Sequence, residues 1–118
     1  SQCFRANTLG AKLLACAAAQ YEIPLVTYSS DLVFDGGQER AYVEHDSPRA
    51  LNAYGESKLL AEREVLKVSP KSLVIRTSSF FGPWDDYNFL TVSLQRLKRG
   101  EKVFAVNDWT VSPTYVPS

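Results

Sequence analysis

Apolar residues recur along the chain in two alternating patterns, one with helical spacing and one with short continuous runs. This alternation restricts the possible folds more than any other feature. The helical spacing predicts helices over residues 4–20, 53–68 and 88–99. The short runs predict strands over residues 25–28, 72–76 and 103–106. Helices that alternate with short buried strands are typical of an α/β fold with a parallel sheet.

Residues at the ends of these segments fit the same interpretation. Asn52 is suited to cap the second helix, and Gly100 is suited to end the third. Residues 31–52 form a long predicted loop, and long loops in compact domains usually carry function. An irregular tail is expected from Ser112–Pro113 onward. In the first helix, Leu9, Leu13, Leu14 and Ala17 lie on one face at helical spacing, and alanines occupy most other positions.

Charge and length exclude several classes of protein. The chain has 13 basic residues (lysine and arginine) and 13 acidic ones (aspartate and glutamate), so its formal net charge is zero. It therefore offers no basic surface for nucleic acid or anionic lipid. The apolar run at residues 13–19 is too short to span a membrane. No signal-peptide pattern opens the sequence. We therefore predict a cytoplasmic protein without nucleic-acid or membrane partners.

Cysteine, histidine and methionine content adds further expectations. Cys3 and Cys16 are expected to be free thiols, because a disulfide within one helix would distort it. With a single histidine we predict no metal site, and Glu44–His45–Asp46 is interpreted as part of a solvated loop. The sequence contains no methionine, which is expected of one part of a longer polypeptide.

Candidate catalytic residues occur where the second helix begins. Tyr54 and Lys58 are four residues apart, so both side chains lie on one face of the helix. An ammonium group near a phenol stabilises the phenolate and lowers the tyrosine pKa, which suits proton transfer near neutral pH. The alternative is an ordinary amphipathic helix with Lys58 in solvent.

A serine hydroxyl at the end of the first strand adds to this pair. The carboxyl ends of strands are where α/β sheets place their chemistry. Ser30 could hydrogen-bond a substrate carbonyl while Tyr54 protonates the oxygen. The alternative is that Ser30 satisfies backbone groups at the strand end.

These residues belong to a longer ordered series that resembles the extended short-chain dehydrogenase/reductases. The likeness is greatest to the branch that reduces nucleotide-linked 4-keto-6-deoxy sugars such as the precursor of dTDP-L-rhamnose. It covers almost the whole chain. The matching residues are Asn7, Leu14–Cys16, Ser29–Gly36, Tyr42, Glu44, Asp46, Pro48, Asn52, Tyr54–Lys58, Ala61–Glu62, Arg76–Ser78, Phe81–Gly82, Asn88–Phe89, Asp108 and Ser112–Tyr115.

The resemblance implies a role for each candidate residue. Tyr54 would donate a proton to the ketone oxygen, and Lys58 would hold the ribose of the nicotinamide cofactor, NADP or NAD. Ser30 stands where the family usually has threonine and keeps the hydroxyl. The resemblance further implies cofactor contacts for Tyr54, Lys58, Thr77 and Ser78. It implies contacts with a nucleotide-sugar substrate for Ser30, Asp31, Ser79 and Asn88.

Departures from the family pattern bear on the reaction and the substrate. Leu32 stands where related dehydratases have a glutamate and cannot do acid–base work, so elimination chemistry is disfavoured. Leu32 and Ser79 also replace a tyrosine and a tryptophan of the family, which leaves the exact sugar open. Two other functions remain open: a non-catalytic subunit of the same fold, and a sugar-nucleotide epimerase. Asp31 and the Ser112–Thr114 stretch argue against the epimerase.

The glycine-rich turn that holds the cofactor pyrophosphate is absent from this sequence. The resemblance therefore predicts a single partial domain over residues 1–118, the C-terminal half of a Rossmann-like doubly wound parallel sheet. We expect these residues by themselves to be inactive and not to bind the cofactor usefully. An apolar strand exposed at the sheet edge could pair with another copy, so self-association or a homo-oligomer is also expected.

Overall fold

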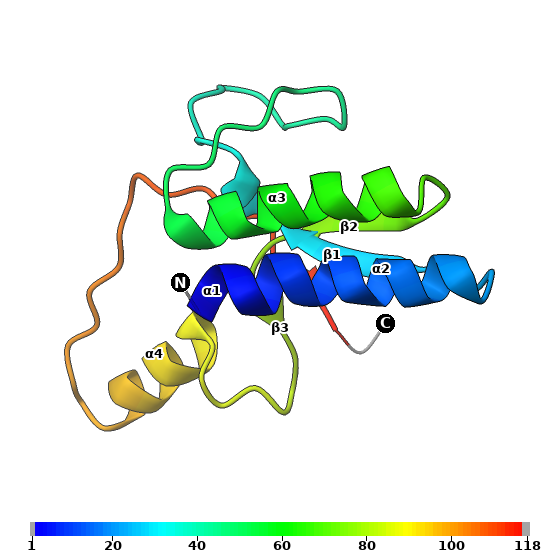
Figure 1. The fold of residues 1–118 in the computed structure, drawn as a ribbon. Coiled ribbons are helices and arrows are strands. Elements are labelled where there is room, and N and C mark those ends of the chain that lie inside the picture. The colour runs from blue at the N-terminus through cyan, green and yellow to red at the C-terminus, as the bar shows by residue number, and fades with distance from the viewer. Residues whose placement is uncertain (1, 117–118) are drawn as a thin grey trace. The chain divides into compact units, whose positions relative to one another are not determined.

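The computed structural model describes residues 2–116 (Figure 1). The chain divides into two compact units, Ser1–Arg76 and Thr77–Ser118, and each is described by itself. The single partial domain that the sequence predicts stays a prediction. Along residues 2–116, no helix combines the length and the apolar character needed to cross a membrane.

The first unit begins with a nearly continuous helical segment, as the sequence predicts. It comprises α1 (Gln2–Phe4), a turn with π-type hydrogen bonding, η1 (Arg5–Leu9), and α2 (Gly10–Gln20). At the start of α2 the Gly10 N–H donates to the Arg5 carbonyl, which is the five-residue spacing of a π-turn. Leu9 and Gly10 keep right-handed helical dihedral angles, so the axis continues through the turn.

A strand–helix–strand unit follows. β1 (Val26–Ser30) leads into a short 3₁₀ turn, η2 (Asp31–Val33), and then into the long loop. α3 (Ala53–Val68) connects to β2 (Leu73–Thr77), which pairs with β1 in a parallel two-stranded sheet. Figure 1 shows α2 and α3 side by side, and α3 packs against β1.

The second helix, α3, has the bounds and the cap that the sequence predicts. The Asn52 side chain accepts a hydrogen bond from the Gly55 N–H at 2.8 Å, which satisfies one of the unpaired donors of the first turn. The Ser69 N–H then donates to the Val65 carbonyl at the other end. The helix is therefore held at both ends by local hydrogen bonds.

The leucine face of the first helix is exposed, and an alanine face is buried instead. Leu13 and Leu14 are 60% and 66% exposed, while α2 buries Ala15 and Ala18. Alanine has the smallest side chain that still favours a helix, so an alanine face lets two helices approach closely. The core of the described residues consists of Ala15, Ala18, Val33, Leu59, Ala61 and Val65.

In the second unit, α4 (Phe89–Lys98) is capped by Asn88 and ends before Gly100, which has a φ of 74°. The strand predicted at 103–106 is wrong, because this segment has no hydrogen-bonded strand partner and runs as irregular backbone. Instead β3 (Phe80–Phe81) pairs in parallel with β4 (Thr114–Tyr115), within the stretch expected to be irregular.

Candidate active site

The first turns of α3 carry the predicted tyrosine–lysine pair, and Lys58 contacts β1. Tyr54 is 43% exposed at the start of the helix. One turn later, the half-buried Lys58 donates from Nζ to the Tyr28 carbonyl of β1 at 2.8 Å. Lys58 therefore contacts the strand, which disfavours the alternative of an amphipathic helix with its lysine in solvent.

The last residue of β1, Ser30, is buried and already hydrogen-bonded. Its Oγ donates to Asp31 Oδ1 at 3.0 Å and accepts from the Leu32 N–H at 3.2 Å. The hydroxyl thus caps η2, as the structural alternative for this serine expects. A role for Ser30 and Asp31 in substrate binding stays a prediction.

Gly55 brings Ser30 and the tyrosine–lysine pair together. A Cβ at this position would overlap the Leu32 carbonyl oxygen and lie 2.9 Å from the Leu32 carbonyl carbon. Backbone therefore packs directly on backbone, which only glycine permits. Because Leu32 follows Ser30 by two residues and Gly55 adjoins Tyr54, this contact places the strand end next to the first turn of α3.

Ser57 holds the N-terminal helical segment on the same turn. Its side chain is completely buried, and its Oγ donates to the Tyr54 carbonyl at 2.7 Å. The amide of Asn7 donates to Ser57 Oγ at 3.0 Å, and Thr8 Oγ1 donates to the Ser57 carbonyl at 2.7 Å. The Cys3 thiol lies 3.3 Å from the same hydroxyl. Sequence analysis gave none of these residues a role.

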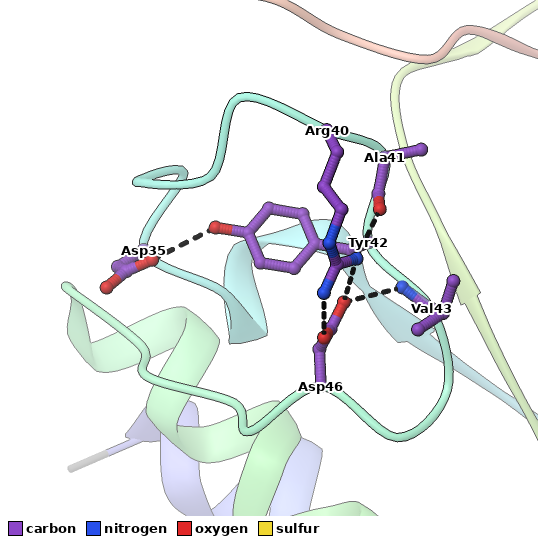
Figure 2. Close-up of polar contacts among 6 residues, drawn as sticks. All are labelled: Asp35, Arg40, Ala41, Tyr42, Val43 and Asp46. Atoms are coloured by element: carbon purple, nitrogen blue, oxygen red, sulfur yellow. Dashed lines mark hydrogen bonds and ion pairs between the residues drawn. The ribbon is translucent and has the colours of Figure 1, made fainter.

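The long loop carries its own hydrogen bonds, which Figure 2 shows. Arg40 binds Asp46 through two guanidinium–carboxylate hydrogen bonds of 2.9 and 2.6 Å, and the Val43 N–H donates to the same carboxylate at 2.8 Å. The Arg40 hydrogen bonds, with that of the Val43 N–H, lower the pKa of Asp46 to about 2. Asp46 is therefore an ionised, fully engaged side chain rather than a freely solvated one.

Aromatic contacts join this loop to the rest of the first unit. The Tyr42 hydroxyl donates to Asp35 Oδ1 at 3.0 Å, and the Tyr42 ring stacks on Phe34 with the centroids 4.1 Å apart. The guanidinium of Arg76 lies 4.9 Å from the centre of the Phe34 ring and binds Glu62 of α3 with bonds of 2.9 and 2.7 Å. Sequence analysis did not foresee these contacts; those of Arg76 join residues that lie far apart in the chain.

The remaining predicted residues belong to the second unit or its border. Thr77 ends β2, Ser78 is buried, and the Ser79 carbonyl accepts from the Thr114 N–H at 3.1 Å. Asn88 uses both halves of its side-chain amide at the start of α4: it accepts from the Thr91 N–H and donates to the Asp85 carbonyl. The cofactor and substrate roles of Thr77, Ser78, Ser79 and Asn88 stay predictions.

Solved structures similar to this chain have Rossmann-like folds and include several reductases, which confirms the predicted fold class. The dTDP-4-dehydrorhamnose reductase of Bacillus anthracis str. Ames, solved in complex with NADP, is 34% identical with a TM-score of 0.86. The match covers 92% of this chain and 39% of that one. MoeE5, solved in complex with UDP-glucose and NAD, is 30% identical with a TM-score of 0.63, over 82% of this chain and 35% of its own.

Sequence comparison gives the family to which the chain belongs. The dTDP-4-dehydrorhamnose reductase of Aggregatibacter actinomycetemcomitans is 36% identical over 115 residues, which is 98% of this chain and 39% of the relative. The model of the RmlD substrate binding domain matches residues 1–118, and the chain belongs to this family. It spans about two fifths of the length of the curated relative it matches.

Proposed function

We propose that this chain forms the catalytic, substrate-side half of an NAD(P)H-dependent reductase that acts on a nucleotide-linked 4-keto-6-deoxy sugar. The substrate class is that of the relatives named dTDP-4-dehydrorhamnose reductase. The observation that carries the proposal is the close approach of Gly55 to the Leu32 carbonyl. It sets Ser30, at the carboxyl end of a strand, beside the turn of α3 that presents Tyr54 and Lys58.

The residues present fit the nicotinamide-ribose end of a dinucleotide. Tyr54 is 43% exposed and carries a hydroxyl. The Lys58 ammonium has three N–H donors, of which the Tyr28 carbonyl takes one, so further donors remain for ribose hydroxyls. The glycine turn that would hold the pyrophosphate is not in this sequence. When bound, the reduced nicotinamide supplies the hydride for the ketone carbon.

Tyr54 then provides the proton. As the hydride adds to the carbonyl carbon, negative charge develops on the oxygen, and the Tyr54 hydroxyl donates its proton there to complete the alcohol. Ser30 assists by donating a hydrogen bond to the same oxygen. Its single proton goes to Asp31 in the structure, so substrate binding requires the Ser30 hydroxyl to turn from Asp31 to the ketone oxygen.

A cytoplasmic location accompanies this proposal. Cys3 and Cys16 are both free thiols in the structure. Disulfides are rare in the cytoplasm, where thiols are kept reduced. The nucleotide sugar and the nicotinamide cofactor are the proposed small-molecule partners, and pairing of a second copy along the sheet edge stays a prediction.

The test replaces Tyr54 with phenylalanine in the full-length polypeptide that carries these residues. We expect kcat for sugar-dependent NADPH oxidation to fall at least ~10²-fold, the size expected for loss of a general acid. The matched control is Tyr21→Phe, because Tyr21 lies at the end of α2 and is 69% exposed. Turnover of Tyr54→Phe within threefold of the parent would contradict the assignment. A parent with no sugar-dependent oxidation would indicate the non-catalytic alternative.

A further inference from the structure

We propose that Phe34, Arg76 and Glu62 form a positioning clamp for the proposed reductase site. This inference rests on the proposed function and deepens it. The clamp holds the segment that carries Ser30 against the helix that carries Tyr54 and Lys58. None of the clamp residues is proposed to touch the substrate or to transfer a proton.

The first contact of the clamp is between a cation and an aromatic ring. The Arg76 guanidinium carbon lies 4.9 Å from the centre of the Phe34 ring, within the distance at which a cation is attracted to a π-system. Tyr42 stacks on the same ring with an interplanar angle of 17°. Phe34 is therefore held between two planar groups, Tyr42 from the same loop and Arg76 from β2.

The second contact fixes Arg76 to α3. One edge of the guanidinium donates two hydrogen bonds to the Glu62 carboxylate, from Nε at 2.9 Å and from Nη2 at 2.7 Å. The Glu62 side chain is only 8% exposed and that of Arg76 26%. A two-bond geometry of this kind fixes orientation as well as distance, which a lysine cannot reproduce.

Phe34 is directly connected to the Ser30 turn. Its N–H donates to the Asp31 carbonyl at 2.9 Å, and the Leu32 N–H donates to Ser30 Oγ at 3.2 Å. Val33, between them, is completely buried. A shift of Phe34 would therefore move this short turn and the Ser30 hydroxyl with it.

The turn is thus attached to α3 at two separate points. At one point the Leu32 carbonyl packs on Gly55, next to Tyr54. At the other, Phe34 reaches Glu62 through Arg76. Lys58 lies between Gly55 and Glu62 on the helix. Two attachments on either side of Lys58 fix both the distance and the angle between the Ser30 turn and α3. A single attachment would still allow the turn to rotate about it.

The experiment compares Phe34→Leu and Arg76→Lys in the full-length polypeptide. Leucine keeps apolar volume and loses the ring, and lysine keeps the charge and loses the planar fork. We expect each to lower kcat about tenfold, because small displacements of positioned groups cost large factors in rate. We expect the sugar KM to change less than about threefold. Phe34→Tyr, which keeps the ring, should retain the parent kcat.

A second readout does not depend on activity. Hydrogen exchange of the Leu32 and Phe34 amides should rise about tenfold in both variants, because their acceptors belong to the turn that the clamp holds. Amide exchange in the double variant should be no faster than in the single variants, since each single substitution already breaks the clamp. Arg99→Lys is the matched control, because it makes the same substitution in an exposed pair with Glu101.

The outcomes separate this inference from the proposed function. Parent-like kcat and parent-like amide exchange in both variants would overturn the clamp, even if the melting temperature falls, because the residues would then only stabilise the fold. If the parent shows no sugar-dependent oxidation, the proposed function fails and amide exchange alone decides. Faster exchange in both variants then supports the clamp, and unchanged exchange overturns it.

Discussion

Helices α3 and α4 begin with the same type of cap but differ in how much of each helix is buried. Each is capped by an asparagine: Asn52 accepts from the Gly55 N–H at 2.8 Å, and Asn88 accepts from the Thr91 N–H at 2.9 Å. The residues that α3 buries are Gly55, Ser57, Leu59, Ala61, Glu62 and Val65. No residue of α4, described over its whole length, is buried. The cap decides where a helix begins, and burial decides whether it can hold a site.

Ion pairs repeat the same contrast. Glu62 of α3 pairs with Arg76 while nearly buried, and Glu101, beyond α4, pairs with Arg96 and Arg99 in solvent. A desolvated, two-bond pair contributes far more to a unique geometry than an exposed pair does. The contrast predicts that matched changes in the two regions will have unequal effects.

Gly55→Ala should have the largest effect. The new Cβ would overlap the Leu32 carbonyl oxygen, and a backbone atom cannot move aside as a flexible side chain can. We expect a loss of about 3 kcal/mol or more in the free energy of unfolding, at the upper end of overpacking costs. Urea denaturation measures it.

The matched control for that substitution is Gly10→Ala in α2. A Cβ there meets only the Arg5 carbonyl oxygen, at 3.8 Å, and the residue is helical. We expect unchanged or slightly higher stability, because alanine favours a helix over glycine by ~0.5–1 kcal/mol. Equal effects at positions 10 and 55 would contradict the close approach of α3 to the Leu32 backbone.

Removal of the acidic partner in each ion pair should give the next largest difference. Glu62→Ala leaves the Arg76 guanidinium without its carboxylate. We expect a loss of about 2 kcal/mol, below the ~3–5 kcal/mol of a fully buried pair because Arg76 keeps some solvent contact. Glu101→Ala should produce no measurable change. Chemical denaturation of the two variants side by side is the measurement, and a larger loss for Glu101→Ala would reverse the comparison.

Removal of the asparagine caps should give a smaller difference in stability between α3 and α4. Asn52→Ala should cost about 1 kcal/mol of global stability, since α3 is part of the core. Asn88→Ala should speed amide exchange in the first turn of α4 and leave the global unfolding transition unchanged, because α4 contributes no buried residue. A shared, equal loss of global stability would show that α4 is as integral to the fold as α3.

The smallest effect concerns pH. Asp46 has a folded-state pKa of about 2, lower than its ordinary value of 3.8. Its contribution to stability is therefore present above the ordinary value and is lost as the pH falls toward about 2. Arg40→Gln removes the principal cause, so the pKa of the Asp46 carboxyl should rise toward its ordinary value, while the Val43 N–H still holds it below that value. An NMR titration of the carboxyl carbon measures both, and an unchanged midpoint in Arg40→Gln would contradict the assigned cause.

Local signals in the sequence predict the regular elements of the first unit well. The bounds of α3 and its Asn52 cap follow from side-chain periodicity and one capping residue, and the structure confirms both. The buried face of α2 does not follow from periodicity, because the helix has both a leucine face and an alanine face. Which of the two is buried depends on the helix that packs against it. The strand predicted at 103–106 is wrong for a related reason, since a strand requires a neighbour to pair with.

The candidate site divides in the same way. Tyr54 and Lys58 could be found from their spacing, and Ser30 from its place at a strand end. The need for glycine at position 55 could not, because it arises from a carbonyl that lies far away in sequence and close in space. The contact of Arg76 with Phe34 is equally non-local. Sequence patterns therefore indicate the residues proposed for the chemistry more readily than the residues that hold them in place.

The Arg40–Asp46 pair has a consequence for chain entropy. Ser30 and Tyr54 lie at opposite ends of the long loop, so bringing them together means closing it. The pair joins residues only six apart, and short contacts of this kind form early and at little entropic cost. Once it has formed, the segment that must still be ordered is effectively shorter, and each halving of a flexible loop lowers the closure cost by about 0.6 kcal/mol. A salt bridge at the surface, between residues with no proposed catalytic role, can thereby favour the approach of the Ser30 turn to the first turn of α3.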